Sequence, residues 1–450
     1  MHLIHRKESI ILFIGDIIVF ITSLFITLII RYRVFPSTEI IKSHLAPFSI
    51  LFIVFILVNF IAGLYEKHTL IFKNRLPSIL LNVQLINAVI GIAFFYFIPY
   101  YSITPKTVLF IYVVLSLILM SLWRVFIAPK LGPKRSQKAL LIGDTKETEE
   151  LFEEINNNSR YHLSFLKIII PNDNNEEISR EIINYIKENK ISVVVLDTKN
   201  KNLINVIPSL YSLALSGILF FDISKIYESI FDRIPPSLIG QTWFIEHVSS
   251  MSSQPIYDSV KRILDIIISL IGLLLSLLFY PFIIIALKIE DERNVLFTYQ
   301  PRIGQNNKII NIIKFRTMKI ANDNGNVSGT GNYVTKIGSF LRKTRLDEIP
   351  QFWNIFKGDL SLVGPRPEIP KYVDKYSNEI SNYMIRHSVK PGVFGWAQIY
   401  HEKHPHHGID ITETENKLSY DLYYIKHRSL LLDIKIILRS IKVLLSFVGR

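Results

Sequence analysis

Apolar residues are gathered into long uninterrupted stretches in this chain, and this bunching limits the fold more than any other feature. Four stretches occur before residue 130, each close to the ~20 residues with which an α-helix crosses a bilayer. They are Ile10–Ile30, Pro47–Leu64, Ile79–Ile98 and Val108–Ala128. Basic residues are denser before the first stretch, after the second and after the fourth than in the other loops. The positive-inside rule therefore predicts four transmembrane helices in residues 1–130, with both ends of the block in the cytoplasm.

Charge and composition narrow the classes of partner. The formal charge of +13 suits a protein that lies against anionic lipid and handles anionic substrates. Nucleic acid is the other partner that such a charge indicates, but the membrane stretches argue against it. Because the chain has no cysteine, disulfide bonds, a thiolate nucleophile and Cys-ligated metal centres are excluded.

An alternating pattern of strands and helices begins at Gln137. Apolar strands are predicted at Lys138–Asp144, Leu163–Pro171 and Ile191–Asp197, with helices between them. Such alternation predicts a parallel sheet of Rossmann type. The first strand ends in Gly143-Asp144 without the further glycines of a dinucleotide fingerprint. We therefore interpret residues 137–250 as a degenerate nucleotide-binding domain that serves assembly or regulation.

A fifth apolar stretch, residues 261–288, leaves two membrane topologies open. It is long enough to span a bilayer, and on hydropathy alone a straight span is favoured. It is also interrupted at Tyr280-Pro281, where a bend could return the chain to the same face. If the C-terminal region uses cytoplasmic substrates, the stretch must be re-entrant, because a fifth crossing would place that region outside.

Residues 258–450 are predicted to be a third domain, of which residues 289–450 are strongly basic. This basic part begins with a hairpin-like stretch at residues 295–319 and a Gly/Asn-rich loop at Ala321–Gly331.

The domain is centred on the segment RKTRLDEIPQFWNIFKGDLSLVGPRPE, which starts at Arg342. We expect Asp347 to cap a helix, Pro350 to lie in its first turn and Gly358 to end it. The apolar side chains between Phe352 and Phe356 are expected to pack inward. A carboxylate at the positive end of a helix dipole should have a lowered pKa. Taken alone, the acid pair favours a simpler interpretation, a capping Asp beside a solvated Glu, because acidic residues are common at helix starts.

The residues around this pair favour phosphoryl chemistry. Several cations suit a diphosphate substrate, and a carboxylate can attack phosphorus to form an acyl-phosphate. A neighbouring carboxylate can hold Mg²⁺, which prefers oxygen ligands and bridges phosphates. The apolar stretch at residues 261–288 would then deliver a lipid acceptor.

Four segments in the same order resemble the signatures of a known family. These are KFRTM, LDEIPQFWNIFKGDLSLVGPRPE, KPGVFGWAQI and YDLYYIK, and they resemble the bacterial sugar transferases, the monotopic phosphoglycosyl transferases that load polyprenyl phosphate. The resemblance implies a re-entrant membrane helix, a mainly α (α+β) catalytic domain at the cytoplasmic side of the bacterial inner membrane, and a ping-pong reaction. Sugar-1-phosphate would pass from a UDP-sugar to the enzyme and then to undecaprenyl phosphate, with UMP released, as the first membrane step of exopolysaccharide, capsule or O-antigen synthesis. At family level a homodimer and contacts with other polysaccharide assembly enzymes are also suggested.

Roles follow from this resemblance position by position. Asp347 would be the nucleophile, and Glu348 would be the Mg²⁺ ligand. The other residues would bind substrate: diphosphate at Arg302, Lys314, Arg316, Arg342 and Arg366, the nucleotide-sugar at Lys390 and Asp421, and the lipid phosphate at Lys261 and Arg262.

Three points remain open at this stage. The predicted last helix, Leu430–Val448, carries a polar stripe of Lys435, Arg439, Lys442 and Ser446, which indicates a helix in the membrane interface or, alternatively, one packed in a protein core. Four histidines between His401 and His407 raise the question of zinc, although a solvated loop is the favoured interpretation. Two other functions are weighed against the transferase: a membrane-bound nucleotide-sugar dehydratase, which needs a Tyr-x-x-x-Lys pair that residues 138–250 lack, and a non-catalytic scaffold.

Overall fold

The structure is a computed structural model, and its elements fall into two compact units, Met1–Ile230 and Phe231–Arg450. The residues that it describes are 6–65, 76–98, 106–128, 137–158, 161, 163–171, 175–204, 206–239, 254–290, 295–319, 333–400 and 410–445. The loop expected at Ala321–Gly331 and the histidines at 401–407 lie outside these residues. The three-part division at residues 130, 137–250 and 258 stays a prediction.

The four N-terminal stretches form helices, as predicted. They are α1 (Arg6–Tyr32), α2 (Thr38–Ile61), α3 (Leu76–Phe97) and α4 (Lys106–Ser121), the last continued by a π-helical segment, Leu122–Ile127. By length and composition these four helices can cross a membrane, and the described residues hold a fifth candidate only if a later bent pair counts as one span. Phe20, Phe48, Phe55 and Tyr112 pack between the helices. Apolar residues such as Ile53 and Val89 point outward at more than 60% exposure, as expected of a lipid-facing surface.

A fully buried ion pair joins the first and last parts of this bundle. Arg124 donates from Nε to Asp16 Oδ1 over 2.9 Å and from Nη1 to the Leu64 carbonyl oxygen over 2.6 Å. Asn59 and the Tyr65 hydroxyl also donate to the Asp16 carboxylate. A charge buried in an apolar bundle is tolerated when it is paired and hydrogen-bonded. The contact therefore fixes how α1, α2 and the end of α4 fit together.

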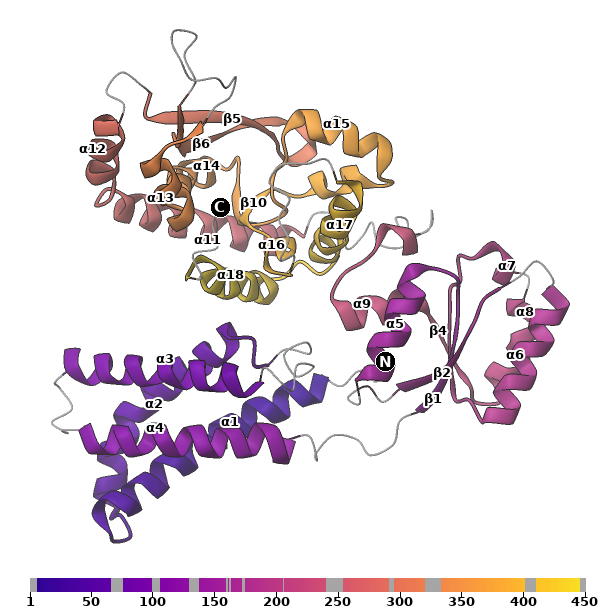
Figure 1. Ribbon diagram of the computed structural model, residues 1–450, viewed down its shortest axis with the longest axis horizontal. Coiled ribbons are helices and arrows are strands. Elements are labelled where there is room, and N and C mark those ends of the chain that lie inside the picture. The colour runs from indigo at the N-terminus through magenta and orange to yellow at the C-terminus, as the bar shows by residue number, and fades with distance from the viewer. Residues whose placement is uncertain are drawn as a thin grey trace. The chain divides into compact units, whose positions relative to one another are not determined.

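The α/β region is a parallel sheet, as the alternating pattern predicts. Its strands are β1 (Gln137–Ile142), β2 (Leu163–Ile169), β3 (Val193–Leu196) and β4 (Leu219–Asp222), in the order β2-β1-β3-β4. All three neighbouring pairs are parallel. The helices are α5 (Lys146–Asn157), α6 (Asn175–Asn189), α7 (Lys201–Ile204), α8 (Ile207–Leu215) and α9 (Ile223–Phe231). Figure 1 shows α5 and α6 on opposite sides of the sheet. The fourth strand was not predicted, because its LFFD segment is too short to give an alternating signal.

The second unit begins with a short 3-10 turn, Pro236–Leu238, and a bent helix pair. α11 (Pro255–Ser276) and α12 (Tyr280–Glu290) meet at 57°. The break falls on residues 277–279, so Pro281 lies in the first turn of α12, where no backbone N–H is needed. A bend is thus present at the predicted place, and it is compatible with either a broken span or a re-entrant loop.

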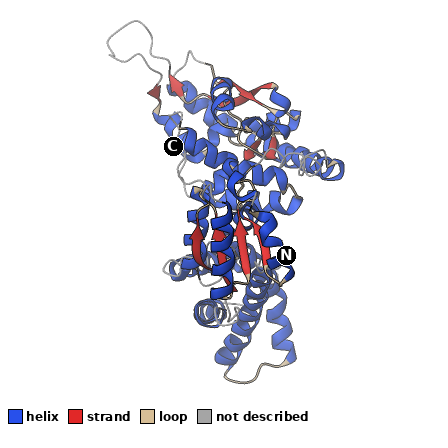
Figure 2. Ribbon diagram, turned by 90° about the vertical axis from the view of Figure 1, so that its right-hand side faces the viewer, coloured by secondary structure: helices blue, strands red, loops and turns tan. Residues whose placement is uncertain are grey.

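Short strands and helices make up the rest of the second unit, in which Figure 2 shows little strand. The predicted hairpin is the antiparallel pair β5 (Phe297–Ile303) and β6 (Ile309–Phe315), joined by a 3-10 turn at Gln305–Asn307. Two further pairs are β7 (Met318–Lys319) with β8 (Tyr333–Val334), and β9 (Ser361–Val363) with β10 (Gly392–Phe394). The remaining helical elements are α13 (Lys336–Thr344), η5 (Leu346–Glu348), α14 (Gln351–Lys357), α15 (Pro370–Glu379), η6 (Tyr383–Ser388), α16 (Trp396–Tyr400), α17 (Ile411–Lys426) and α18 (Leu430–Leu445).

Two members of the polar stripe predicted on the last helix, Lys435 and Arg439, face the protein, whereas Ser446 and the side chain of Lys442 lie outside what the structure describes. Arg439 is only 6% exposed, and Lys435 Nζ lies 4.8 Å from the centre of the Trp396 ring. Leu431 and Ile434 are exposed instead. Long basic side chains pack their methylene stems along aromatic rings, so the side of α18 that carries Lys435 lies against the domain and the outward side is apolar.

Candidate active site

The acid pair lies in a tight 3-10 turn, and not at the start of a regular helix as predicted. α13 ends at Thr344, its C-cap residue Arg345 has a left-handed φ of 56°, and η5 follows at once. Arg345 donates from N to Arg342 O over 3.2 Å, and Glu348 donates from N to Arg345 O over 3.1 Å. Pro350 then occupies the N-cap position of α14, one residue before the predicted first turn, and Gly358 ends α14 at φ 96°. The prediction that Asp347 caps this helix is therefore wrong, whereas the glycine stop is confirmed.

Inward packing of the apolar side chains in α14 is only partly as predicted. Ile355 is buried, and Phe352 packs against the same core. Trp353 is 51% exposed, because it lies on the opposite side of this short helix.

Glu348 lies among three cations. Its Oε1 accepts from Lys314 Nζ over 2.6 Å and from Arg366 Nη2 over 3.2 Å. Arg345 Nη1 lies 3.6 Å from its Oε2. Burial alone would raise the pKa of this carboxyl, but the positive charges of Arg366, Lys314 and Arg345 hold it well below its usual range. Glu348 is therefore ionised at any physiological pH.

Asp347 has the opposite electrostatic environment. It is 8% exposed, and burial together with the adjacent negative charge of Glu348 raises its pKa to about 6. Lys314 and Arg342 act against this shift without cancelling it. The prediction of a lowered pKa is wrong for this residue, because desolvation outweighs any dipole when the group is buried. Two adjacent carboxyls with divergent pKa values are typical of sites where each has a separate chemical task.

Of the other predicted phosphate-binding residues, Arg342 and Arg302 lie close enough to interact electrostatically with the acid pair, whereas the described contact of Arg316 is with the main chain. Arg342 donates from Nε to Thr317 Oγ1 over 2.8 Å, and Arg316 donates from Nε to Met318 O over 2.6 Å. Arg302 interacts electrostatically with Arg366 and Glu348, and burial lowers its pKa. The structure thus brings cations from β5, β6, α13 and the Pro-Arg-Pro turn toward one acid pair, although these segments are far apart in sequence.

Four predicted residues lie elsewhere in the unit. Lys261 Nζ lies 2.6 Å from Asp433 Oδ2, and Arg262 donates to Ile355 O and Phe356 O at the end of α14. Lys390 interacts electrostatically with Arg262, while Asp421 is buried and forms an ion pair with Arg386 at 2.8 Å. None of the four contacts the acid pair among the described residues.

Arg386 is a site residue that the sequence analysis missed. It is buried, it donates from Nη1 to the Tyr383 hydroxyl over 2.6 Å, and it donates from Nη2 to Arg366 O over 3.0 Å. Glu368 and Asp421 add negative charge beside it. Its position four residues before Lys390, next to a quoted family segment, is the only sequence signal that could have indicated it.

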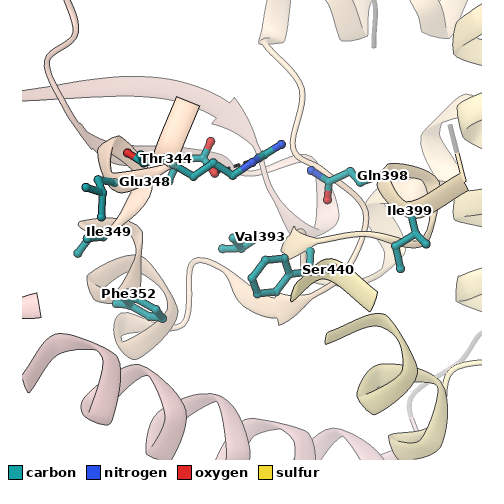
Figure 3. Close-up of a pocket in the computed structure, with 11 residues that line it drawn as sticks. Thr344, Glu348, Ile349, Phe352, Val393, Gln398, Ile399 and Ser440 are labelled. Carbon is teal, nitrogen blue, oxygen red and sulfur yellow. Dashed lines mark ion pairs between the residues drawn. The ribbon is translucent and has the colours of Figure 1, made fainter. Parts of the chain in front are cut away.

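A cavity of about 240 Å³ opens beside Glu348. One side is formed by the α13–α14 region, and the other by β10, α16 and α18 (Figure 3). Its lining residues are Thr344, Arg345, Leu346, Glu348, Ile349, Phe352, Val393, Phe394, Gln398, Ile399 and Ser440. The site therefore combines a charged cluster around two carboxyls with an adjoining, mainly hydrocarbon space.

Comparison with known proteins now identifies the second unit. The profile of the family described as "Bacterial sugar transferase" matches residues 256–447. An uncharacterized sugar transferase of Bacillus subtilis (strain 168) is 36% identical over 189 residues, which are 42% of this chain and 88% of that protein. The chain belongs to the bacterial sugar transferase family. This membership confirms the resemblance drawn from the KFRTM, LDEIP and GWAQI segments.

Two longer relatives of this bacterial sugar transferase carry more specific names. A UDP-N-acetylgalactosamine-undecaprenyl-phosphate N-acetylgalactosaminephosphotransferase of Aeromonas hydrophila is 36% identical over 242 residues, covering 52% of this chain and 54% of that protein. A UDP-glucose:undecaprenyl-phosphate glucose-1-phosphate transferase of Escherichia coli (strain K12) is 37% identical over 208 residues, covering 44% of each. The matched region thus spans about half the length of these relatives.

Proposed function

We propose that this bacterial sugar transferase moves a sugar-1-phosphate from a UDP-sugar to undecaprenyl phosphate and releases UMP. The observation that carries the proposal is the acid pair itself, in which a buried Asp347 with a raised pKa adjoins a Glu348 surrounded by Lys314, Arg366 and Arg345. The names of the two longer relatives support the same reaction class. In the cell this reaction would start the lipid-linked assembly of an exopolysaccharide, capsule or O-antigen.

In the proposed reaction Asp347 is the nucleophile. Its carboxylate oxygen attacks the phosphorus that bears the sugar, the bond from this phosphorus to the oxygen of UMP breaks, and UMP leaves. An oxygen of the lipid phosphate then attacks the same phosphorus, which yields the lipid diphosphate sugar and restores the Asp347 carboxylate. Covalent catalysis of this kind divides one difficult displacement into two easier ones. A carboxyl with a pKa of about 6 is more basic than an ordinary aspartate yet still mostly ionised at neutral pH.

The cations would hold the phosphates and stabilise the charge that develops during transfer. Lys314 and Arg366 already contact Glu348, so they lie where an entering diphosphate would meet them. Arg302, Arg316 and Arg342 would add further contacts from the surrounding strands and helix. We assign secondary roles to the remaining predicted residues: Lys390 at the nucleotide-sugar side, Asp421 behind that side through its ion pair with Arg386, and Lys261 and Arg262 near the lipid phosphate.

A divalent cation, Mg²⁺, fits the donor set of this site. Asp347 and Glu348 offer carboxylate oxygens only, and the described residues hold no group of three or more acidic or histidine ligands. Mg²⁺ in phosphoryl-transfer sites is commonly bound by one or two carboxylates together with substrate phosphates. Glu348 would hold the ion once the diphosphate has drawn Lys314 and Arg366 toward itself. The bound ion would neutralise phosphate charge.

For the membrane arrangement we propose that α11 and α12 enter and leave the bilayer on one side, with the rest of residues 258–450 on the cytoplasmic face of the inner membrane. The 57° bend and the exposed apolar residues Leu274, Leu277 and Phe282 support this arrangement. α18 would lie at the membrane interface with its apolar outward side toward lipid.

The α/β region within residues 137–250 would serve assembly, including a homodimer and contacts with other polysaccharide assembly enzymes.

UMP release from purified protein in nanodiscs tests this function. Wild type and Asp347→Asn would be incubated with undecaprenyl phosphate, Mg²⁺ and, separately, UDP-glucose, UDP-galactose and UDP-N-acetylgalactosamine. We expect UMP from one donor, and none from the variant or after chelation. Equal UMP release by wild type and variant would refute Asp347 as the nucleophile. No release from any donor, with an acceptor that a known transferase accepts, would instead favour the scaffold.

A further inference from the structure

The cavity beside Glu348 is lined mainly by hydrocarbon. Leu346, Ile349, Phe352, Val393, Phe394 and Ile399 contribute six of its eleven lining side chains. Two of the polar side chains already use their hydroxyl donors within their own helices: Ser440 donates to Ile436 O over 2.8 Å, and Thr344 donates to Phe340 O over 2.8 Å. The surface that this cavity offers to a ligand is therefore largely apolar.

The few remaining polar groups do not suit a sugar ring. Arg345 and Glu348 are paired with each other. Gln398 points into the cavity (Figure 3), and its Oε1 is buried without a hydrogen-bond partner among the described residues. A hexose carries a hydroxyl on most of its carbons, and each hydroxyl buried without a partner costs free energy. One amide cannot satisfy them, whereas its Nε2–H group can donate one hydrogen bond to the phosphate of a lipid.

The cavity also adjoins the apolar helix α11. Phe352, which lines the cavity, packs so closely on Gly272 of α11 that a Cβ on that glycine would lie 2.8 Å from the ring. Around Gly272 the neighbouring residues Ile271, Leu274 and Leu275 are all more than 50% exposed and apolar. A hydrocarbon chain that leaves the bilayer along α11 would therefore meet apolar side chains of this helix before it meets Phe352 at the cavity.

We propose that this cavity binds the first isoprene units of the polyprenyl phosphate acceptor, with the phosphate toward Glu348 and Asp347. The inference rests on the proposed function and assigns a position to its second substrate. The volume of about 240 Å³ is below the roughly 300–1,000 Å³ of pockets that enclose a drug-sized ligand, so the cavity takes only a short segment of the lipid. The rest of the lipid stays along α11 in the membrane.

The two half-reactions allow a test with Val393→Phe, which fills the cavity from β10. Val334→Phe is the matched control, because Val334 is 40% exposed on β8 and does not line the cavity. In nanodiscs of fixed lipid composition, the rapid release of one UMP per enzyme without acceptor is measured first. Steady-state turnover with undecaprenyl phosphate follows. We expect Val393→Phe to keep the size of the UMP burst and to raise the KM for undecaprenyl phosphate by about tenfold or more, as a filled hydrophobic pocket does. Val334→Phe should match wild type in both.

A photoreactive acceptor provides an independent readout. An analogue with a diazirine on its first isoprene unit should label peptides that contain Val393 or Ile399 in wild type, and label them less in Val393→Phe. The inference is overturned if the label falls outside the cavity, or if Val393→Phe alters the burst or the KM for the UDP-sugar while the acceptor KM stays unchanged. If wild type gives no burst although it turns over, the covalent mechanism fails. The labelling result then still decides where the lipid binds.

Discussion

Arg386 donates a hydrogen bond of 3.0 Å to the main-chain carbonyl oxygen of Arg366. A buried cation therefore fixes the main chain of the Pro-Arg-Pro turn. The same turn directs the Arg366 side chain to Glu348 at 3.2 Å. Asp421 neutralises Arg386 at 2.8 Å. A chain of contacts thus runs from α17 through η6 to the acid pair, and Asp421 acts on the site through Arg386.

We expect Arg386→Met to destabilise the protein strongly, because it leaves Asp421 buried without its partner. Removal of one member of a buried pair typically costs about 3–5 kcal/mol. Thermal unfolding of the detergent-solubilised protein measures the loss. Lys371→Met, at an exposed position of α15, is the control and should unfold like wild type.

Arg386→Lys should retain more stability than Arg386→Met yet still lower kcat for UMP release, since an ammonium group cannot reproduce the bonds to Asp421, Tyr383 and Arg366 together. Full activity in Arg386→Lys would contradict a positioning role.

The proposed nucleophile gives a pH dependence with a defined sign. Asp347 must be ionised to attack, and its pKa is about 6. The rate of the first half-reaction should therefore be constant above about pH 7 and fall about tenfold per pH unit well below pH 6. Measuring the UMP burst without acceptor excludes any contribution from ionisation of the lipid phosphate. A burst rate that stays constant down to pH 4.5 would contradict this assignment.

The same raised pKa predicts that ionised Asp347, the proposed nucleophile, lowers the stability of the folded protein. The pKa of Asp347 is higher in the folded protein than the ~3.9 of an unfolded aspartate. The folded state therefore binds more protons between these values, and ionised Asp347 opposes folding above pH 6. Asp347→Asn should be inactive but unfold at a higher temperature than wild type at pH 7.5, and this difference should shrink as the pH falls toward 4. Asp374→Asn, at an exposed position, should show no such trend. A lower unfolding temperature for Asp347→Asn at pH 7.5 would refute the linkage.

Local features of the fold could be read from the sequence, and non-local ones could not. The four apolar helices, the hairpin around Arg302 and Lys314, and the stop at Gly358 depend on short segments with strong patterns. The sign of the Asp347 pKa shift depends on burial, which residues distant in sequence provide. The pairing of Arg386 with Asp421 joins positions 35 residues apart, and no spacing rule indicates it. Likewise α18 has a basic stripe in sequence, but only the position of Trp396 reveals that Lys435 faces the protein.

The ion pair in the N-terminal bundle predicts that a variant lacking one member of the pair loses more stability than a variant lacking both. Arg124→Leu leaves the Asp16 carboxylate fully buried, with Asn59 and Tyr65 as its remaining donors among the described residues, so we expect a loss of about 3–5 kcal/mol. Asp16→Leu combined with Arg124→Leu removes both charges and should regain most of this loss. The yield and thermal stability of protein extracted from membranes measure both effects. Arg31→Leu, at an exposed helix end, is the control. Additive losses in the double variant would show that the pair does not couple the helices.

The contact between Gly272 and Phe352 predicts that one added methyl group disturbs both packing and acceptor use. In Gly272→Ala the new Cβ would lie 2.8 Å from the Phe352 ring, which must move away from α11 and toward the cavity. Overpacking of this kind costs about 1–3 kcal/mol. We therefore expect a lower unfolding temperature and a higher KM for undecaprenyl phosphate. The double variant Gly272→Ala/Phe352→Leu has room for the methyl group, so it should recover stability relative to Gly272→Ala. Alanine favours a helix more than glycine does. A rise in stability for Gly272→Ala alone would therefore show that α11 and α14 separate freely, and the close contact that joins α11 to the cavity would then carry no argument.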